Sequence, residues 1–353
     1  MTARPAESTA WEPAMRRALE LAARGPATDP NPRVGCVLLD AAGRTLGEGW
    51  HRGAGTPHAE VAALSDAEQR GLDVGGATAV VTLEPCNHTG RTGPCAEALC
   101  EAGVARVVVA QPDPTPLAAG GADRLRAAGL EVTTGVLADE AEALNRWFTA
   151  SAHLGRPVVT LKLAATLDGR VAAADGTSQW ITGPDARRDV HRQRAQAGAV
   201  VVGTGTALAD DPRLTVRLPE GEQVDRQPLR VVVGTRQLPA PARVLDDAAE
   251  TLLLATHDPA EVLAALRERG VHHVWLEGGP TLGAAFLRAG LVDRLVTYLA
   301  PALLGAGAPL VAELGIGTVE EALRWHLEDV ARLGDDVRLT LTPTDPNPTE
   351  GDA

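Results

Sequence analysis

Short apolar runs alternate with helical patterns along most of this chain. In its first part, apolar runs typical of buried strands occupy residues 77–83 and 104–110. Helical patterns occupy residues 58–70 and 94–103, with Pro94 at the first helical position. Strands that alternate with helices in this way favour a mostly parallel sheet with helices on both faces. The pattern therefore predicts the α/β fold class.

A second alternation begins after residue 156. An amphipathic helix is expected over residues 140–156, and the β-rich run 158–163 follows it. Further strands and one helix are expected at residues 200–202, 229–233, 274–276 and 281–289. The composition change after the amphipathic helix is typical of a boundary between two domains.

Length supports the same division. A chain of 353 residues is about twice an average domain, so two separate cores are the default expectation. We place a first domain at residues 1–150 and a second at residues 151–353. Residues 1 to about 8 and the Pro/Thr/Asp-rich tail from about residue 343 are expected to be disordered.

The composition limits the partners. A net charge of −13 argues against nucleic acid, because binding it requires a basic surface that neutralises phosphates. No apolar run is long enough to cross a membrane and no signal peptide pattern is present, so we expect a cytoplasmic protein without a membrane partner. Cys36 and Cys100 lie in apolar settings and are interpreted as small core residues.

His58, Glu60, Cys86 and Cys95 form the pattern with the clearest chemistry. One imidazole and two thiols can hold a zinc ion, and three protein ligands leave a tetrahedral position open for water, as in catalytic zinc sites. Zinc lowers the pKa of such a water toward neutrality. Glu60 stands two residues from the histidine, where the His-x-Glu zinc deaminases have the glutamate that carries protons. The pattern predicts a zinc cofactor and hydrolytic removal of an exocyclic amine.

The expected elements would bring these ligands together. His58 falls in the first turn of one predicted helix and Cys95 near the start of another, where the helix N-terminus favours the thiolate that zinc requires. The alternative is that His58 is an ordinary helix-capping residue and that Cys86 and Cys95 form a disulfide. Four cysteines in 353 residues are more typical of a reducing compartment, which favours the metal site.

Eight residues separate Cys86 from Cys95, whereas the general deaminase pattern has two. With His51 and the segment 31–36 (N-P-R-V-G-C), the stretch 81–95 closely resembles the deaminase half of the bifunctional RibD family of riboflavin biosynthesis. That family combines a V-T-L-E-P-C stretch, a His-x-Gly-[Arg/Lys]-Thr loop and a second Pro-Cys. The resemblance implies a cytidine-deaminase-like three-layer domain and a diaminopyrimidinone ribosylamine phosphate as substrate. The substrate-binding residues it implies are Asn31, His51, His88 and Arg91.

Lys162 is the only lysine among the 33 lysine and arginine residues of the chain. It lies in an apolar strand pattern shortly before Asp168-Gly169, where a solvated charge is not expected. A lysine at a strand end in a cleft can have a shifted pKa or hold an anion, so we interpret it as functional. The alternative is that its side chain merely extends from the strand to water.

Two glycine-containing turns could approach a nucleotide. The turn 203–206 follows a strand but lacks the third glycine of the dinucleotide-binding pattern, so it is a weak indication. The turn 277–280 lies between a predicted strand and helix, and the free N–H groups of Thr281, Leu282 and Gly283 could bind a pyrophosphate. The alternative is a plain strand-to-helix turn.

Segments after residue 156 resemble, in order, the C-terminal reductase half of the same family. This half implies a dihydrofolate-reductase-like fold, and the whole resemblance covers about residues 10 to 340. Lys162 and Glu277 are expected to be catalytic. The implied substrate-binding residues, with the arginines on the phosphate, are Ser178, Arg194, Leu214 and Arg217. The implied cofactor-binding residues are Ala164, Trp180, Thr206, Asp210, Gly278, Gly279, Thr281, Leu282 and Gly283.

The end of the strand 229–233 favours NADPH as the cofactor. Thr235 and Arg236 stand where an NAD-specific site would have an acidic residue for the ribose 2′-hydroxyl. A hydroxyl and an arginine suit a 2′-phosphate, so both residues join the expected cofactor site. The alternative is that Arg236 is a solvated charge at a strand end.

Three classes of function follow. The leading one is a bifunctional enzyme that removes the pyrimidine amine and then reduces the ribosyl group to ribityl with NADPH. Its expected partners are the phosphorylated pyrimidine and further copies of the same chain. The segment 113–121 and Gly93 depart from the usual family pattern, which keeps a related pyrimidine or pterin-like pathway open. A non-catalytic zinc-stabilised binding module is the third class, and Glu60 argues against it because a structural zinc needs no acid-base neighbour.

Overall fold

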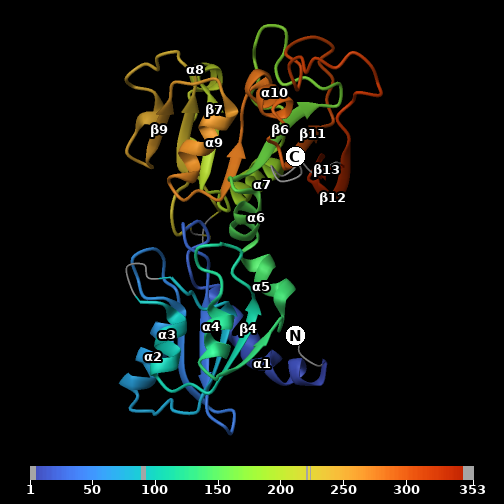
Figure 1. Ribbon diagram of the computed structural model, residues 1–353. Helices are drawn as coiled ribbons and strands as arrows, with labels where there is room; N and C mark the ends of the chain where they lie inside the picture. Colours follow the sequence, from blue (N-terminus) through green and yellow to red (C-terminus); the bar gives the residue numbers. More distant parts are fainter. Residues whose placement is uncertain (1–4, 89–92, 220–221, 223, 345–353) are drawn as a thin grey trace. The chain divides into compact units, whose positions relative to one another are not determined.

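The computed structural model describes residues 5–88, 93–219, 222 and 224–344, and Figure 1 shows the course of the chain. The chain divides into two compact units, Met1–Gly155 and Arg156–Ala353. Each unit contains a sheet with helices packed on both faces. Within the described ranges, none of the helices combines the length and the apolar character needed to span a bilayer.

The first sheet has the strand order β2-β1-β3-β4-β5. Its strands are β1 (Gly35–Leu39), β2 (Thr45–Trp50), β3 (Thr78–Leu83), β4 (Arg106–Gln111) and β5 (Glu131–Thr134). As predicted, β3, β4 and β5 are parallel, whereas β1 runs antiparallel to β2 and β3. The sequence analysis missed the hairpin of β1 and β2. Gly49 of β2 is required there, because a Cβ would lie 2.4 Å from the carbonyl oxygen of Ala59 in the adjoining helix.

Alternate side chains of this sheet face two helical layers. Helices α1 (Pro5–Ala22) and α5 (Ala138–Leu144) cover one face, and α2 (Ala59–Gln69), α3 (Cys95–Glu101) and α4 (Gly121–Ala127) cover the other. In β1, Cys36 and Leu38 pack toward α2 and α3, whereas Val37 and Leu39 pack toward α1. This confirms the three-layer arrangement. Cys36 is a core residue as predicted, while Cys100 is only half-buried at the edge of the same core.

Two expectations for the first unit were wrong. Helix α1 begins at Pro5, so the disorder expected up to about residue 8 does not extend over its first turn. The single helix expected over residues 140–156 is two helices, α5 and α6 (Arg146–Leu154), separated by Asn145 with φ −110° and ψ 22°. Ser151, near which a domain junction is expected, lies within α6. Both helices are short because the polar Asn145 turns inward to bond another segment.

The second sheet has the strand order β12-β13-β11-β6-β10-β7-β8-β9. Its strands are β6 (Val158–Thr166), β7 (Ala199–Gly203), β8 (Leu229–Val233), β9 (Thr251–Leu254), β10 (His273–Leu276), β11 (Arg294–Ala300), β12 (Trp325–Leu333) and β13 (Asp336–Pro343). The six neighbouring strands β11, β6, β10, β7, β8 and β9 are parallel to one another. At the β11 edge, β13 pairs antiparallel with β11, and β12 pairs antiparallel with β13. Pro343 is the last residue of β13, and the tail expected from about this position stays a prediction. The tail beyond Thr344 lies outside the described residues.

Helices cover both faces of the second sheet as well. Helices α9 (Pro259–Arg267) and α10 (Pro280–Arg288) pack on one face, and α7 (Pro184–Arg194) and α8 (Thr204–Asp210) on the other, while a short 3-10 turn spans Arg243–Leu245. On the central strand β6, Leu161 and Leu163 belong to the core under α9 and α10. Because side chains alternate along a strand, Lys162 points to the face that carries α7.

Candidate active sites

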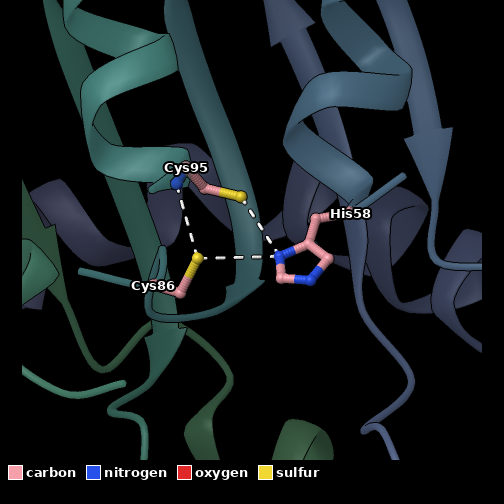
Figure 2. A group of neighbouring side chains, drawn as sticks. All are labelled: His58, Cys86 and Cys95. Atoms are coloured by element: carbon pink, nitrogen blue, oxygen red, sulfur yellow. Dashed lines mark hydrogen bonds between the residues drawn. The ribbon is translucent and has the colours of Figure 1, made fainter. Parts of the chain in front are cut away.

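His58, Cys86 and Cys95 come together where α2 and α3 begin (Figure 2). His58 Nδ1 lies 3.6 Å from Cys86 Sγ and 3.3 Å from Cys95 Sγ, and the ligand atoms of the three residues lie within 4.8 Å of one another. Zinc bonds of about 2.0 to 2.3 Å in tetrahedral geometry place a nitrogen and a sulfur about 3.5 Å apart. The three side chains therefore fit a single zinc ion, with Nδ1 as the histidine ligand.

The local backbone explains this convergence. His58 is the N-cap of α2 with extended backbone angles, Cys95 is the first residue of α3, and Cys86 follows β3 after a short turn. The sequence analysis expected Pro94 at the first helical position of α3, but Pro94 is its N-cap. The helix therefore begins one residue later than expected, at Cys95. The backbone N–H of Cys95 donates to Cys86 Sγ at 3.4 Å. The hydrogen bond from the Cys95 side chain lowers the pKa of Cys86 to about 4. His58 lowers this pKa as well, whereas burial of the thiol raises it.

Glu60 is the second residue of α2 and is buried beside the three ligands. Burial raises the pKa of its carboxyl to about 7, and the nearby His58 opposes that rise. The carboxyl is shielded from bulk water and close to the metal ligands without being one of them in the cluster. This placement suits a group that exchanges protons with a molecule held in the site.

Asn31 and His51 form a bonded pair next to His58. His51 Nδ1 lies 3.1 Å from the carbonyl oxygen of Pro57, and a carbonyl can only accept, so this nitrogen carries the proton. His51 Nε2 therefore accepts a hydrogen bond from Asn31 Nδ2 at 3.0 Å. The His51 ring meets the His58 ring edge-on, with centroids 5.4 Å apart. Asn31 Oδ1 has no hydrogen-bond partner among the described residues, and it remains available to a ligand.

This geometry changes the role expected for His51. The residue is buried and both ring nitrogens are engaged by the protein, so it supports Asn31 and does not offer a ring nitrogen to substrate. Burial also lowers the pKa of His51, which keeps the ring neutral. His88 keeps a buried Nδ1 without a partner in the described residues, consistent with a ligand contact. Arg91, also expected to bind substrate, lies outside the described residues.

Glu84 is a site residue that the sequence analysis missed. Its carboxylate accepts hydrogen bonds from the backbone N–H groups of Asp113 at 3.1 Å and Ala122 at 2.8 Å. Gly121 lies against the same turn, because a Cβ there would be 1.7 Å from the carbonyl oxygen of Pro85. Glu84 thus ties the segment 113–121 to the turn that precedes Cys86. A charged residue ending an apolar strand was the available signal.

In the second unit, Lys162 and Glu277 lie on neighbouring parallel strands. Leu161 of β6 is paired with Leu276 of β10, and the two charged residues follow directly. Glu277 leaves β10 as predicted, but Lys162 is not at a strand end, because β6 continues to Thr166 alongside β11.

The amine of Lys162 has no hydrogen bond or ion pair in the described part of the chain. Burial lowers the pKa of Lys162, and the charge of Arg194 lowers it further, while Glu277 and Asp210 raise it. The side chain is therefore a desolvated amine set between opposite charges, and is not simply extended into water.

Arg194 forms a bidentate ion pair with Glu277. Its Nε and Nη2 donate to the two carboxylate oxygens at 2.5 and 2.7 Å, and its Nη1 donates to the carbonyl oxygen of Thr215 at 3.1 Å. Trp275 Nε1 also donates to Glu277, at 2.7 Å. Burial would raise the pKa of Glu277, but the ion pair with Arg194 outweighs it and holds the pKa at about 2.

The contact of Arg194 with the substrate phosphate remains a prediction, because three of the five N–H groups of Arg194 are engaged by Glu277 and Thr215. Arg217 is the better candidate. It is exposed, and its Nη1 donates to Thr215 Oγ1 at 3.2 Å. Partial burial and the charges of Arg194, Arg243 and Arg213 lower the pKa of Arg217, so positive charge gathers around it. Such a cluster suits a phosphate.

Of the other expected substrate residues, Ser178 donates to Asp210 Oδ1 at 3.4 Å. Asp210 is an expected cofactor residue, so the structure brings these two together. Leu214 is 2% exposed and packs in the core cluster that includes Ala164 at its margin. Its side chain cannot line a ligand site because the core encloses it. Only its backbone, held at φ 55°, remains for such a contact.

The glycine turns expected to bind the cofactor lie against each other. Gly279 would place a Cβ 3.3 Å from Thr206 Oγ1, and Gly278 would place one 2.9 Å from the side chain of Leu282. Gly283 follows on α10 and lies near Leu161. Thr281 is exposed on the first turn of the same helix, one residue after Pro280.

Arg236 approaches the same turns from the end of β8. A Cβ on Gly205 would lie 2.8 Å from Arg236 Nη2, and Thr235 is exposed beside it. Trp180 is 68% exposed and carries the guanidinium of Arg187 over its ring, 4.5 Å from the centroid. Most residues predicted for the cofactor therefore gather around the carboxyl ends of β7, β8 and β10, whereas Ala164, Trp180 and Asp210 make no contact with these turns in the described part of the chain.

The first unit is thus built as a zinc deaminase, and the second as a reductase with a mixed sheet of the dihydrofolate-reductase kind. Comparison with known proteins agrees. Residues 9–111 match the cytidine and deoxycytidylate deaminase zinc-binding region, and residues 157–339 match the RibD C-terminal domain.

Full-length relatives carry both parts. The riboflavin biosynthesis protein RibD of Mycobacterium tuberculosis is 52% identical over 316 residues, which cover 89% of this chain and 91% of the relative. The RibD protein of Escherichia coli K12 is 44% identical, with 93% and 98% covered. The solved structure of Acinetobacter baumannii RibD, form 2, is 42% identical with a TM-score of 0.84, covering 96% of this chain and all of that one.

The chain belongs to the RibD family of riboflavin biosynthesis. It is a bifunctional enzyme, with a zinc-binding deaminase domain followed by a reductase domain of the NADPH-dependent type. The predicted fold class, both activities and both cofactors are confirmed. The individual site residues remain predictions, refined by the geometry described above.

Proposed function

We propose that the first unit removes the 2-amino group of 2,5-diamino-6-(5-phosphoribosylamino)pyrimidin-4(3H)-one and that the second reduces the ribosyl group of the product to ribityl. A similar solved structure from Thermotoga maritima, 34% identical with a TM-score of 0.82, is named a diaminohydroxyphosphoribosylaminopyrimidine deaminase and 5-amino-6-(5-phosphoribosylamino)uracil reductase. The observation that carries the proposal is the convergence of His58, Cys86 and Cys95 around one point with Glu60 buried beside them.

In the deaminase site, His58, Cys86 and Cys95 would hold the zinc, which when bound would supply a water of lowered pKa. Glu60 takes a proton from the water and returns it to the departing nitrogen, so that ammonia leaves and the oxygen stays on C2 of the ring. Asn31 Oδ1 accepts a hydrogen bond from the pyrimidine, because its Nδ2 is committed to His51.

In the reductase site, NADPH when bound would supply a hydride to the first carbon of the opened sugar. The nitrogen of the resulting amine must gain a proton, and the desolvated amine of Lys162 is placed to donate it. Glu277 is held ionised by Arg194 and keeps Lys162 charged enough to act. Arg217, surrounded by further arginines, binds the substrate phosphate.

The contact with the cofactor's 2′-phosphate is assigned to Arg236, with Thr235 beside it. Arg236 lies over the glycine of the β7–α8 turn and has no ion pair within the described chain. An uncommitted guanidinium next to a backbone turn suits a phosphate monoester, and nothing acidic at this strand end favours a free ribose hydroxyl.

Self-association, a cytoplasmic location and the absence of nucleic acid partners remain predictions. The outermost strand β12 supports the first, because Leu327 and Val330 on it are both more than half exposed. Light scattering of the purified protein tests self-association. The acidic net charge of −13 supports the last.

The proposed function is tested by incubating the zinc-loaded protein with the diaminopyrimidinone ribosylamine phosphate, with and without NADPH, and analysing the products by mass spectrometry. Without NADPH, the amine should be replaced by oxygen with release of ammonia. With NADPH, the deaminated product should also gain two hydrogens. Turnover of a different pyrimidine in preference to this one would refute the substrate assignment.

A further inference from the structure

Asn145 separates α5 from α6, and its side chain bonds a segment 112 residues earlier in the chain. Its Oδ1 accepts a hydrogen bond from the backbone N–H of Arg33 at 2.9 Å, and its Nδ2 donates to the backbone carbonyl of Arg33 at 2.8 Å. Asn145 is 6% exposed. The amide therefore satisfies both backbone groups of one residue in a buried place, as a neighbouring strand would.

The segment held in this way leads to the deaminase site. Asn31 stands two residues before Arg33, and its side chain donates to His51 Nε2. The backbone N–H of His51 in turn donates to the carbonyl oxygen of Val34 at 2.9 Å. His51 is therefore joined to the segment by one backbone and one side-chain hydrogen bond. His51 packs edge-on against the metal ligand His58. A shift of Arg33 would move Asn31 relative to the metal centre.

The turn around Asn145 also binds the side chain of Arg33. Arg33 Nη2 donates to the carbonyl oxygen of Leu144 at 2.5 Å, so side chain and backbone of Arg33 are both tied to the break between α5 and α6. The break itself is unusual, because Asn145 leaves helical geometry while the residues on both sides remain helical. Without the bonds to Arg33, the patterned sequence would favour the single helix expected over residues 140–156.

We propose that Asn145 is a positioning residue of the deaminase site, fixing the segment 31–34 so that Asn31 stays in register with the zinc ligand His58. The inference rests on the proposed contact between Asn31 and the pyrimidine. Asn145 lies beyond residues 9–111, which match the zinc-binding region, so the motif alone does not contain it. Removing its side chain takes away one hydrogen-bond partner each from the half-buried N–H and the half-buried carbonyl of Arg33, and the segment must shift to replace them.

The test compares Asn145→Ala and Asn145→Asp with the parent in the full chain. Asn145→Ala should raise the KM of deamination about tenfold to a hundredfold with a smaller change in kcat, because misplacement of about 1 Å has effects of this size. Asn145→Asp keeps the acceptor for the Arg33 N–H and should recover part of the loss. Zinc content, and reduction of added deaminated intermediate by NADPH, should stay at the parent level in both variants.

Two further variants separate the explanations. Thr149→Val is the matched control, because it removes a buried hydrogen bond of α6, from Gln111 Nε2 at 2.8 Å, without touching Arg33. Asn31→Ala tests the proposed contact itself. If Asn31→Ala raises KM while Asn145→Ala behaves like Thr149→Val, the positioning role is overturned and the proposed function stands. If Asn31→Ala leaves KM unchanged, the proposed contact fails instead, and the positioning inference fails with it.

Discussion

Replacing Glu277 by glutamine should destabilise the second unit and abolish its reductase activity. The substitution keeps the shape of the side chain but leaves the guanidinium of Arg194 buried without its counter-charge; both side chains are 11% exposed. Each pKa unit corresponds to about 1.4 kcal/mol, so the depression of the Glu277 pKa from 4.5 to about 2 corresponds to about 3 kcal/mol of stability. Breaking a buried pair by removing one partner generally costs about 3–5 kcal/mol, which agrees.

The pH dependence of this contribution has a definite sign. The pKa of Glu277 is lower in the folded chain than in the unfolded one, so folding is favoured wherever the carboxyl is ionised in both states. The contribution is complete above about pH 5 and declines as the pH falls through 4.5 toward 2. The difference in free energy of unfolding between parent and Glu277→Gln should therefore be largest near neutral pH and shrink in acid.

Urea unfolding followed by pulsed hydrogen exchange measures this difference, since it reports the two units of the full chain separately. The amides of α7 and β10 should lose protection at lower urea concentration in the variant, while those of the first unit should not change. Glu320→Gln is the matched control, because this glutamate is exposed in the same unit. A destabilisation below about 1 kcal/mol at pH 7, or one that is constant down to pH 3, would refute the reasoning.

Three other outcomes are expected. Lys162→Met should depress NADPH oxidation while leaving zinc content and ammonia release unchanged; reduction near the parent rate in a steady-state assay would show that the amine only extends to water. Arg236→Ala should raise the KM for NADPH about tenfold to a hundredfold, because one charge-assisted hydrogen bond is lost, and should change the KM for NADH little. An equal effect on both cofactors would show that Arg236 does not bind the 2′-phosphate. Fragments 1–155 and 156–353 should each retain their own activity when expressed separately, and a folded second fragment unable to oxidise NADPH with deaminated substrate would contradict a self-contained reductase.

The zinc centre could be predicted because two of its three ligands are cysteines, a residue type that is rare in this chain. The chain has four cysteines, and the two beside prolines are the ligands in the cluster. Periodicity also located six of the thirteen strands that the described residues form, since valine-rich runs such as residues 229–233 favour a strand. The β1–β2 hairpin was missed because its second strand contains glycines that serve the approach of α2 and give no apolar alternation.

The bonding state of polar residues could not be predicted in this way. Sequence shows that Arg194 is an arginine, but only the fold shows that two of its N–H donors are taken by Glu277. The same holds for His51, whose two nitrogens are engaged by Pro57 and Asn31. Long-range partners of this kind depend on tertiary contacts that no local pattern encodes.

Glu60→Gln tests the central claim most directly, because it removes the proton carrier while preserving shape and leaving the three zinc ligands in place. The variant should bind zinc at the parent stoichiometry by metal analysis and lose deamination by a factor on the order of 10²–10⁴ in a single-turnover assay of ammonia release. It should still reduce added deaminated intermediate with NADPH at the parent rate. Deamination within a few-fold of the parent rate, with zinc retained, would contradict the account.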